Sequence, residues 1–302
     1  MRVVVTGGSG FIGRHVVAAL RARGDEVVVA DLRPFPSPEV RCVVGDLRDP
    51  AVVEHAVAPG TEAVVHLAAI TSVLASTRDP HAVFQTNVDA TELALERCRG
   101  LGLGRFVFAS TNAVAGNVGA GPIDEATLPR PLTPYGATKA AAEMLLSAYA
   151  ESYGFTTAVL RFTNVYGAGM QSKDSVVARL MRCALSDGVI EVYGDGEQRR
   201  DFVYVADAVA AIEIGLGLAH PETLTIGAGR SVSMNELVAT AGEVCGAAIR
   251  TEHVAEKPGE MRAVVIDPRR ARALGYAPAY DLHRGLAATW EDFRVHGGGE
   301  TG

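Results

Sequence analysis

The sequence predicts an α/β protein with a doubly wound parallel sheet and a smaller mixed α/β lobe toward the C-terminus. Short runs of β-branched residues are apolar throughout, and helical patterns alternate with them over the first two thirds of the chain. Strands that are apolar on both faces are typical of a parallel sheet covered by helices on both sides. With 302 residues, 48% of them hydrophobic, the chain can form either one large domain or two fused lobes.

The first two thirds of the chain supply the expected sheet and its covering helices. We expect strands at 2–6, 26–30, 41–44, 61–66, 104–109 and 156–161, and helices at 11–23, 82–99 and 135–153. The connections between parallel neighbours should be right-handed.

After Asn164 the regular alternation ends, which indicates a second lobe interleaved with the first. The later elements are expected at 175–186, 189–193, 202–205, 206–218, 223–226, 234–245, near 268–274 and 282–294, and those from 202 to 218 should return to the large sheet. The expected division is a first domain of 1–165 and about 200–220, a second lobe of about 166–199 and 221–296, and a flexible Gly-rich tail at 297–302.

The charge of the chain argues against nucleic acid and membrane partners. The net charge is −7 and the pI about 5.6, and no basic tract interrupts this balance. Such a surface repels both nucleic acid and anionic membranes. Any phosphate group of a ligand must therefore be bound by individual cationic side chains or by helix N-termini.

Cysteine usage and apolar run lengths indicate a cytoplasmic protein. The four cysteines, Cys42, Cys98, Cys183 and Cys245, are far apart and form no CxxC pair, so we expect free thiols, no disulfide and no metal site. No run of about 18 apolar residues could span a membrane, and the first apolar run is too short for a secretory signal.

A Gly-rich loop at 6–13, TGGSGFIG, stands where the first strand becomes the first helix. Its glycines allow a tight turn, the approach of a pyrophosphate and close packing of helix on strand. The helix N-terminus then offers free N–H groups and a positive dipole end to the phosphates. An ordinary turn could carry the same letters, but the position favours a Rossmann-type dinucleotide site. The expected cofactor contacts in the loop are Gly7, Gly10, Phe11, Ile12 and Gly13.

Asp31, at the end of the second strand, favours NAD over NADP. An acidic residue at this distance past the loop accepts hydrogen bonds from the adenosine ribose, and its charge would repel a 2′-phosphate. Arg33 could serve a 2′-phosphate, which leaves NADP as the less favoured cofactor, and Asp31 could also be a solvated charge at a strand end.

A series of short motifs gives the chain a family resemblance. The motifs are TGGSGFIG at 6–13, GDL at 45–47, HLAA at 66–69, TNV at 86–88, FVFAST at 106–111, YGATK at 135–139, LRFTNVYG at 160–167, YGDGEQRRDFVYVAD at 193–207 and KPGE at 257–260. From Met1 to about Trp290 the chain resembles the extended short-chain dehydrogenase/reductases. Within them it resembles the nucleotide-sugar epimerase/dehydratase group, and in particular 4-epimerases of the UDP-glucose 4-epimerase type.

The resemblance implies further cofactor contacts outside the Gly-rich loop. Asp46 and Leu47 would flank the adenine, and Ala68 and Ala69 would line the path of the dinucleotide. Asn87 would brace the active-site region.

Tyr135 and Lys139 are the expected base and its cationic partner, and they lie on one face of a helix because they are four residues apart. Lowering the pKa of a tyrosine from about 10 to working pH takes about 3 units, or roughly 4 kcal/mol. A nearby ammonium and a positive nicotinamide ring are suited to supplying this stabilisation of the phenolate. The resemblance also assigns Lys139 to the nicotinamide ribose and Thr111 to the hydroxyl that relays a proton, whereas Ser110 should point away. The alternative is an incidental Tyr/Lys pair on an exposed helix.

The two residues after Thr111 narrow the expected reaction. The resemblance implies that the sugar C4 hydroxyl is first oxidised to a ketone. Relatives that dehydrate the sugar carry Asp-Glu directly after the Ser/Thr, and those that decarboxylate it carry Glu at the second place, whereas this chain has Asn112 and Ala113. We therefore expect 4-epimerisation. The alternatives are a 4-ketosugar reductase, a 3,5-type rearrangement, a dehydratase, a plain alcohol dehydrogenase and a cofactor-binding sensor without turnover. Ala115 replaces a usual aromatic residue and leaves the sugar open.

The resemblance also implies a set of contacts to a nucleotide-diphosphate sugar. Arg200 would hold the diphosphate through a planar fork, with Arg199 as the alternative, and Asn164 would donate its amide to phosphate or sugar. The remaining expected contacts are Thr71, Ser72, Lys257 and Glu260. The base and sugar stay open. His66 is expected to be a packed residue, and helices 82–99 and 135–153 are expected to form a homodimer interface.

Overall fold

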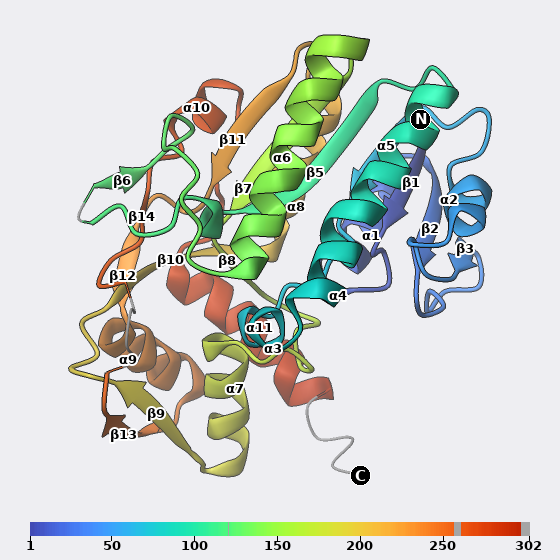
Figure 1. Ribbon diagram of the computed structural model, residues 1–302. Helices are drawn as coiled ribbons and strands as arrows, with labels where there is room; N and C mark the ends of the chain where they lie inside the picture. Colours follow the sequence, from blue (N-terminus) through green and yellow to red (C-terminus); the bar gives the residue numbers. More distant parts are fainter. Residues whose placement is uncertain (120, 257–260, 297–302) are drawn as a thin grey trace.

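The computed structural model describes residues 1–119, 121–256 and 261–296 (Figure 1). Within them, a seven-stranded sheet has the order β11-β7-β5-β4-β1-β2-β3, and every neighbouring pair is parallel. Its strands are β1 Arg2–Thr6, β2 Glu26–Asp31, β3 Arg41–Val44, β4 Ala63–His66, β5 Arg105–Thr111, β7 Thr156–Phe162 and β11 Glu222–Ile226. The doubly wound parallel α/β fold is confirmed.

Helices cover both faces of this sheet, which explains why its strands are apolar throughout. The helices α1 Phe11–Ala22 and α8 Val205–Gly217 pack on one face, and α2 Pro50–Ala56, α5 Ala90–Gly100 and α6 Pro134–Tyr153 pack on the other (Figure 1). Alternate residues of a strand point to opposite faces. Val3 and Val5 of β1 therefore belong to the core beneath α1 and α8, and Val4 belongs to the core beneath α5 and α6.

Local signals set the ends of α6, the helix that carries Tyr135 and Lys139. The Thr133 hydroxyl accepts a hydrogen bond from the Gly136 amide, and Pro134 takes the first helical position. Gly154 ends the helix in the left-handed conformation, with φ of 70°.

The expected helix at 82–99 is interrupted. After α3 Val73–Arg78, it is built from α4 Pro80–Phe84, a π-helical turn at Gln85–Asp89, and α5. π-helical turns of this kind are often found at functional sites, and this one carries Asn87.

The smaller lobe lies below the large sheet in Figure 1. Its core contains Tyr166, Met181, Phe202, Leu237 and Phe293. Its strands are β6 Pro122–Ile123, β8 Asn164–Tyr166, β9 Val189–Tyr193, β10 Arg199–Tyr204, β12 Ser231–Ser233, β13 Arg250–Val254 and β14 Val265–Ile266, and its helices are α7 Val176–Ser186, α9 Met234–Cys245 and α11 Leu282–His296. The short helix α10 Arg269–Ala273 instead packs beside β11 of the large sheet (Figure 1). None of the helices in the described ranges is long and apolar enough to cross a membrane.

Two strands lie in a different sheet from the one expected. Residues 223–226 are expected in the smaller lobe, but β11 pairs with β7 and forms the edge of the large sheet. The strand expected at 202–205 does not return to the large sheet, because β10 pairs with β8 and β12. Only α8, which follows β10, packs back on the large sheet. The apolar pattern of a strand does not specify its pairing partner, so these two predictions are wrong. The division into two domains stays a prediction.

Candidate active site

The candidate site lies where the order of the large sheet reverses. From β1 the chain runs outward through β2 and β3, and it then returns to build β4, β5, β7 and β11 on the other side of β1. Ligands of open α/β sheets bind beyond the carboxyl ends of the strands at such a point. Thr6, His66 and Thr111 end β1, β4 and β5, which are neighbours here.

Backbone contacts require glycine in the Gly-rich loop. A Cβ atom at Gly13 would lie 2.2 Å from the Gly7 carbonyl oxygen, and one at Gly7, whose φ is +70°, would lie 2.7 Å from the Ala68 amide nitrogen. Gly10 is the N-cap residue of helix α1, and no side chain among the described residues caps the helix. Its first amide groups therefore remain available to an anion, so the loop fits the pyrophosphate of a dinucleotide. Phe11 and Ile12 form the first turn.

Asp31 joins the loop to the end of β2. Its two carboxylate oxygens accept hydrogen bonds from the amides of Ser9, at 3.0 Å, and Arg33, at 3.1 Å. The carboxylate is thereby held beside the loop, where a ribose contact remains a prediction.

The other predicted cofactor contacts differ in their surroundings. The Asp46 carboxylate is paired with Arg48, at 2.6 Å, and this hydrogen bond lowers the pKa of Asp46. Leu47 is buried in the core beneath α5 and α6. Ala68 and Ala69, directly after β4, are half-buried. The roles of these four residues at the adenine and along the dinucleotide stay predictions.

His66 is buried as a neutral packed residue, as expected. Because the Thr91 hydroxyl donates to the Asn87 carbonyl at 2.8 Å, it accepts from His66 Nε2, at 3.1 Å. The Thr6 hydroxyl then donates to Nδ1, at 2.9 Å. Burial, followed by the charge of Lys139, lowers the pKa of His66 to about 3.

Asn87 links the segment after β4 to α6. Its side chain accepts from the Ile70 amide at 2.8 Å and donates to the Ile70 carbonyl at 3.0 Å and to the Thr138 hydroxyl at 3.1 Å. Thr138 in turn donates to the Tyr135 carbonyl, at 2.9 Å. These contacts are those of a residue that braces this region, and the Asn87 side-chain amide makes them within the protein.

Thr111 interacts with Tyr135, and Lys139 is buried rather than exposed on the helix surface. Tyr135 is hydrogen-bonded to Thr111, and Lys139 is only 2% exposed. The Lys139 ammonium lies 4.3 Å from the centroid of the Phe108 ring, at a distance suited to a cation–π contact. Gly136 lets α6 pack closely against the segment after β5, since a Cβ there would lie 2.7 Å from the Ala113 carbonyl oxygen.

Burial opposes the charged form of both groups. It raises the pKa of Tyr135, and the hydrogen bond from Thr111 only partly counteracts this. Burial also lowers the pKa of Lys139 to about 7, against the attraction of Glu143. The expected lowering of the tyrosine pKa is therefore not produced by the chain's own residues, and it requires a further positive charge beside the phenol.

The substitution at Ala115 is absorbed by packing. Ala115 is 1% exposed and packs with Ile123, Val264 and Ile266. The small side chain at this position is thus enclosed by the loop around β6 and the segment around β14.

The predicted substrate residues fall into three groups. Asn164 is exposed and donates to the Asp201 carbonyl at 2.8 Å, and Thr71 is exposed. The Ser72 hydroxyl caps α3, because it accepts a hydrogen bond from the Ala75 amide at 3.1 Å. This contact has a structural role within the protein. Lys257 and Glu260 lie outside the described residues.

The two neighbouring arginines of β10 are arranged differently. Arg199 donates to the Ser231 carbonyl at 2.7 Å and lies 3.6 Å from Glu236. Arg200 donates to the Arg199 carbonyl at 2.9 Å and is half-buried. Arg199 is thus held against the smaller lobe, and Arg200 stays the predicted diphosphate residue.

Sequence reasoning missed two buried carboxylates. Asp201, at 0% exposure, accepts from the Thr163 hydroxyl and from three successive backbone amides at 228–230. Glu143 lies one helical turn beyond Lys139. Its spacing from Lys139 was a readable signal, because residues four apart on a helix are neighbours.

Comparison with known proteins agrees with this geometry. Residues 3–227 match the model of the NAD dependent epimerase/dehydratase family. The dTDP-glucose 4,6-dehydratase of Streptomyces niveus is 34% identical, over 97% of this chain and 93% of the relative. The UDP-glucose 4-epimerase of Rhizobium leguminosarum bv. trifolii is 30% identical, over 96% of each chain. The solved structure of Thermus thermophilus UDP-glucose 4-epimerase with NAD has a TM-score of 0.92 and 35% identity, over 98% of this chain and 100% of that one.

Proposed function

The chain belongs to the NAD-dependent epimerase/dehydratase family, and we propose that within it the protein is a nucleotide-sugar 4-epimerase that works through a transient 4-keto sugar. One observation carries the choice of reaction. Tyr135 is hydrogen-bonded to Thr111 and Lys139 is buried one helical turn further on, but the two residues after Thr111 are Asn112 and Ala113, which offer no carboxyl group.

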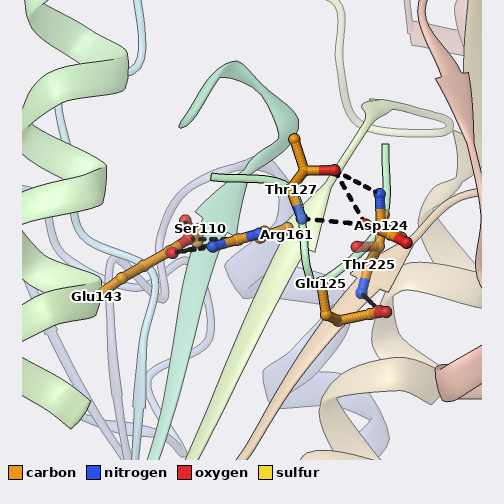
Figure 2. Close-up of polar contacts among 7 residues, drawn as sticks. All are labelled: Ser110, Asp124, Glu125, Thr127, Glu143, Arg161 and Thr225. Carbon is orange, nitrogen blue, oxygen red and sulfur yellow. Dashed lines mark hydrogen bonds and ion pairs between the residues drawn. The ribbon is translucent and has the colours of Figure 1, made fainter. Parts of the chain in front are cut away.

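The next carboxyl groups along the chain are already engaged. Asp124 accepts from the amide and the hydroxyl of Thr127, both at 3.0 Å, and Glu125 accepts from the Thr225 amide at 2.6 Å (Figure 2). Elimination of water from C5 and C6 of a sugar needs a base and an acid, whereas inversion at C4 needs only removal and return of the same hydride and proton.

Each residue of the trio has a distinct part. Tyr135 takes the proton of the C4 hydroxyl and later returns it. Thr111, hydrogen-bonded to Tyr135, orients the sugar oxygen and relays the proton. Lys139 places a positive charge beside the phenol. The Gly-rich loop would hold NAD, which would supply a hydride acceptor and donor at C4, so that no net reduction would accumulate.

The substrate class follows from phosphate recognition. A neutral alcohol or steroid does not need a guanidinium at the site, whereas a nucleotide diphosphate needs its two phosphates neutralised. Arg200 is the residue that we assign to this role. Solved relatives contain UDP-glucose, as in the Thermotoga maritima epimerase, and UDP-glucuronic acid, as in MoeE5. A UDP-linked hexose or uronic acid is the first substrate to test.

We further infer a homodimer. Large apolar side chains are exposed on the side of α4 and α6, where Phe84 is 47%, Met144 64% and Tyr153 54% exposed. Light scattering should give twice the chain mass of 31.6 kDa, and Met144→Glu should reduce it to the single mass. A wild-type protein of single mass would contradict the inference.

A 4,6-dehydratase is the second candidate, since a dTDP-glucose 4,6-dehydratase is 34% identical to this chain. Proton NMR of products from UDP-glucose, UDP-glucuronate, UDP-N-acetylglucosamine and dTDP-glucose with catalytic NAD separates the two. A changed H3–H4 coupling with no net NADH supports the epimerase. A stable 4-keto-6-deoxy product would overturn it and favour the dehydratase, and stoichiometric NADH would favour a dehydrogenase.

A further inference from the structure

A buried ionic cluster lies directly behind the proposed reaction centre. It consists of Ser110 at the end of β5, Glu143 on α6 and Arg161 on β7 (Figure 2). Arg161 Nε lies 3.1 Å from each Glu143 carboxylate oxygen, and Nη2 lies 2.8 Å from Oε2. The Ser110 hydroxyl donates to Glu143 Oε1. All three side chains are buried, with at most 9% exposure.

The cluster ties together the elements that carry the reacting groups. Ser110 directly precedes Thr111, and Glu143 follows Lys139 by one helical turn. Strands β5 and β7 are neighbours, with Ser110 opposite Arg161 in the register. The two-pronged contact from Arg161 and the hydroxyl of Ser110 fix the position of the Glu143 carboxylate, and with it the spacing between the end of β5 and α6.

Few other charges act on Lys139. On β5 its ammonium meets the uncharged Phe108 ring, and on β4 the nearby His66 is neutral. Tyr135 lies one turn earlier on α6, and Arg161 of β7 is paired with Glu143.

Asn87, on the π-helical turn, faces α6 with an uncharged amide group. The Glu96 carboxylate of α5 accepts hydrogen bonds from Arg99 and Tyr149. Among the described residues, Glu143 is therefore the carboxylate positioned to favour the charged form of Lys139.

We propose that Ser110, Glu143 and Arg161 form a positioning cluster that holds one carboxylate behind Lys139 and thereby raises the fraction of this buried lysine that is charged at neutral pH. The proposal rests on the part given to Lys139 in the proposed function. Burial alone penalises the ammonium, and Glu143 opposes that penalty through space without a direct ion pair that would draw Lys139 away from Tyr135. Arg161 serves as the fixed partner because a guanidinium keeps its proton.

The composition of the chain makes a direct test practical. Its only lysines are Lys139, Lys173 and Lys257. Protein labelled with 13C at the lysine ε-carbon therefore gives three signals, and the Lys139 signal is identified by its loss in Lys139→Arg. Its titration can be followed without cofactor, substrate or turnover, so the result does not depend on the proposed reaction.

The variant to compare is Glu143→Gln, with Glu151→Gln, an exposed residue on the same helix, as the matched control. Removing the attraction of Glu143 should lower the titration midpoint of Lys139 by about one pH unit, whereas Glu151→Gln should leave it in place. Where turnover is measurable, the alkaline limb of the kcat profile should move to lower pH by the same amount, with KM little changed.

If Glu143→Gln does not fold, the double variant Glu143→Gln/Arg161→Met removes both charges of the cluster. It should lower the Lys139 midpoint by a smaller amount than Glu143→Gln does, because it removes the repulsion of Arg161 together with the attraction of Glu143. An unchanged midpoint in a folded variant would overturn the proposal. Absence of turnover in the wild type together with a shifted midpoint would instead leave the cluster supported and refute the epimerase.

Discussion

Replacing Tyr135 by Phe removes one hydroxyl and leaves the packing of the ring in place. The lost groups are the proposed base and its hydrogen bond with Thr111. A positioned acid–base group contributes about 10²- to 10⁴-fold to the rate, so kcat should fall by that factor, or by about 3–5 kcal/mol of activation free energy. The loss of one hydrogen bond is worth about 1 kcal/mol in stability, and relief of the cost of burying the neutral hydroxyl partly offsets it.

The assay is turnover of the active nucleotide sugar, followed by NMR, together with NAD binding by calorimetry and thermal unfolding. Tyr153→Phe is the matched control, because Tyr153 is 54% exposed at the far end of the same helix. We expect the Tyr135 variant to bind NAD and to unfold within a few degrees of the wild type. A Tyr135→Phe protein that keeps full kcat would refute the assignment of the base.

Other consequences of the geometry can be checked separately. Gly13→Ala should abolish NAD binding in calorimetry, since its Cβ would lie 2.2 Å from a carbonyl oxygen, whereas Gly217→Ala, with nothing within 4 Å, should bind NAD normally; equal affinity in both would contradict the loop geometry. His66 has a pKa of about 3 when folded against 6.5. The unfolded chain therefore binds more protons between these values, and stability should fall by at most roughly 5 kcal/mol as pH drops through this window. Urea unfolding of His66→Gln should show a weaker acid dependence than the wild type, and identical slopes would argue against a neutral His66. Asp201→Asn places an amide group against three backbone donors and should lower the unfolding free energy by about 2–4 kcal/mol; a midpoint in denaturant equal to that of the wild type would show that these contacts contribute little.

The alternation of strands and helices could be predicted because each element has its own local pattern. The pairing of strands could not be predicted, because β10 and β11 are both apolar runs. Which sheet each of them joins depends on contacts that form only in the folded chain. The edge position of β11 also depends on Glu125, which accepts from the Thr225 amide across a sequence separation of 100 residues (Figure 2). A contact between residues so far apart in the chain cannot be predicted from any local stretch of the sequence.

In the candidate site, too, the short-range patterns could be predicted from the sequence and the long-range contacts could not. The Gly-rich loop and the Tyr135/Lys139 spacing are short-range patterns and were found directly. The contact of Ser110 with Glu143 could be anticipated only as a side chain that faces away from Thr111, and its ionic partner Arg161 comes from another strand. Ser72 was expected at the substrate, yet its hydroxyl caps α3. A serine hydroxyl can bind a substrate or cap a helix, and the sequence pattern alone does not distinguish the two roles.

The fate of the hydrogen on C4 tests the central proposal most directly. The nucleotide sugar that turns over should be prepared with deuterium at C4 and incubated with enzyme and catalytic NAD in ordinary water. The proposal predicts that the C4 epimer retains its deuterium at C4, because the hydride leaves and returns within one bound complex. Deuterium found at C6, or lost from a ketone product, would contradict the 4-epimerase and show that the chain carries out another reaction of its family.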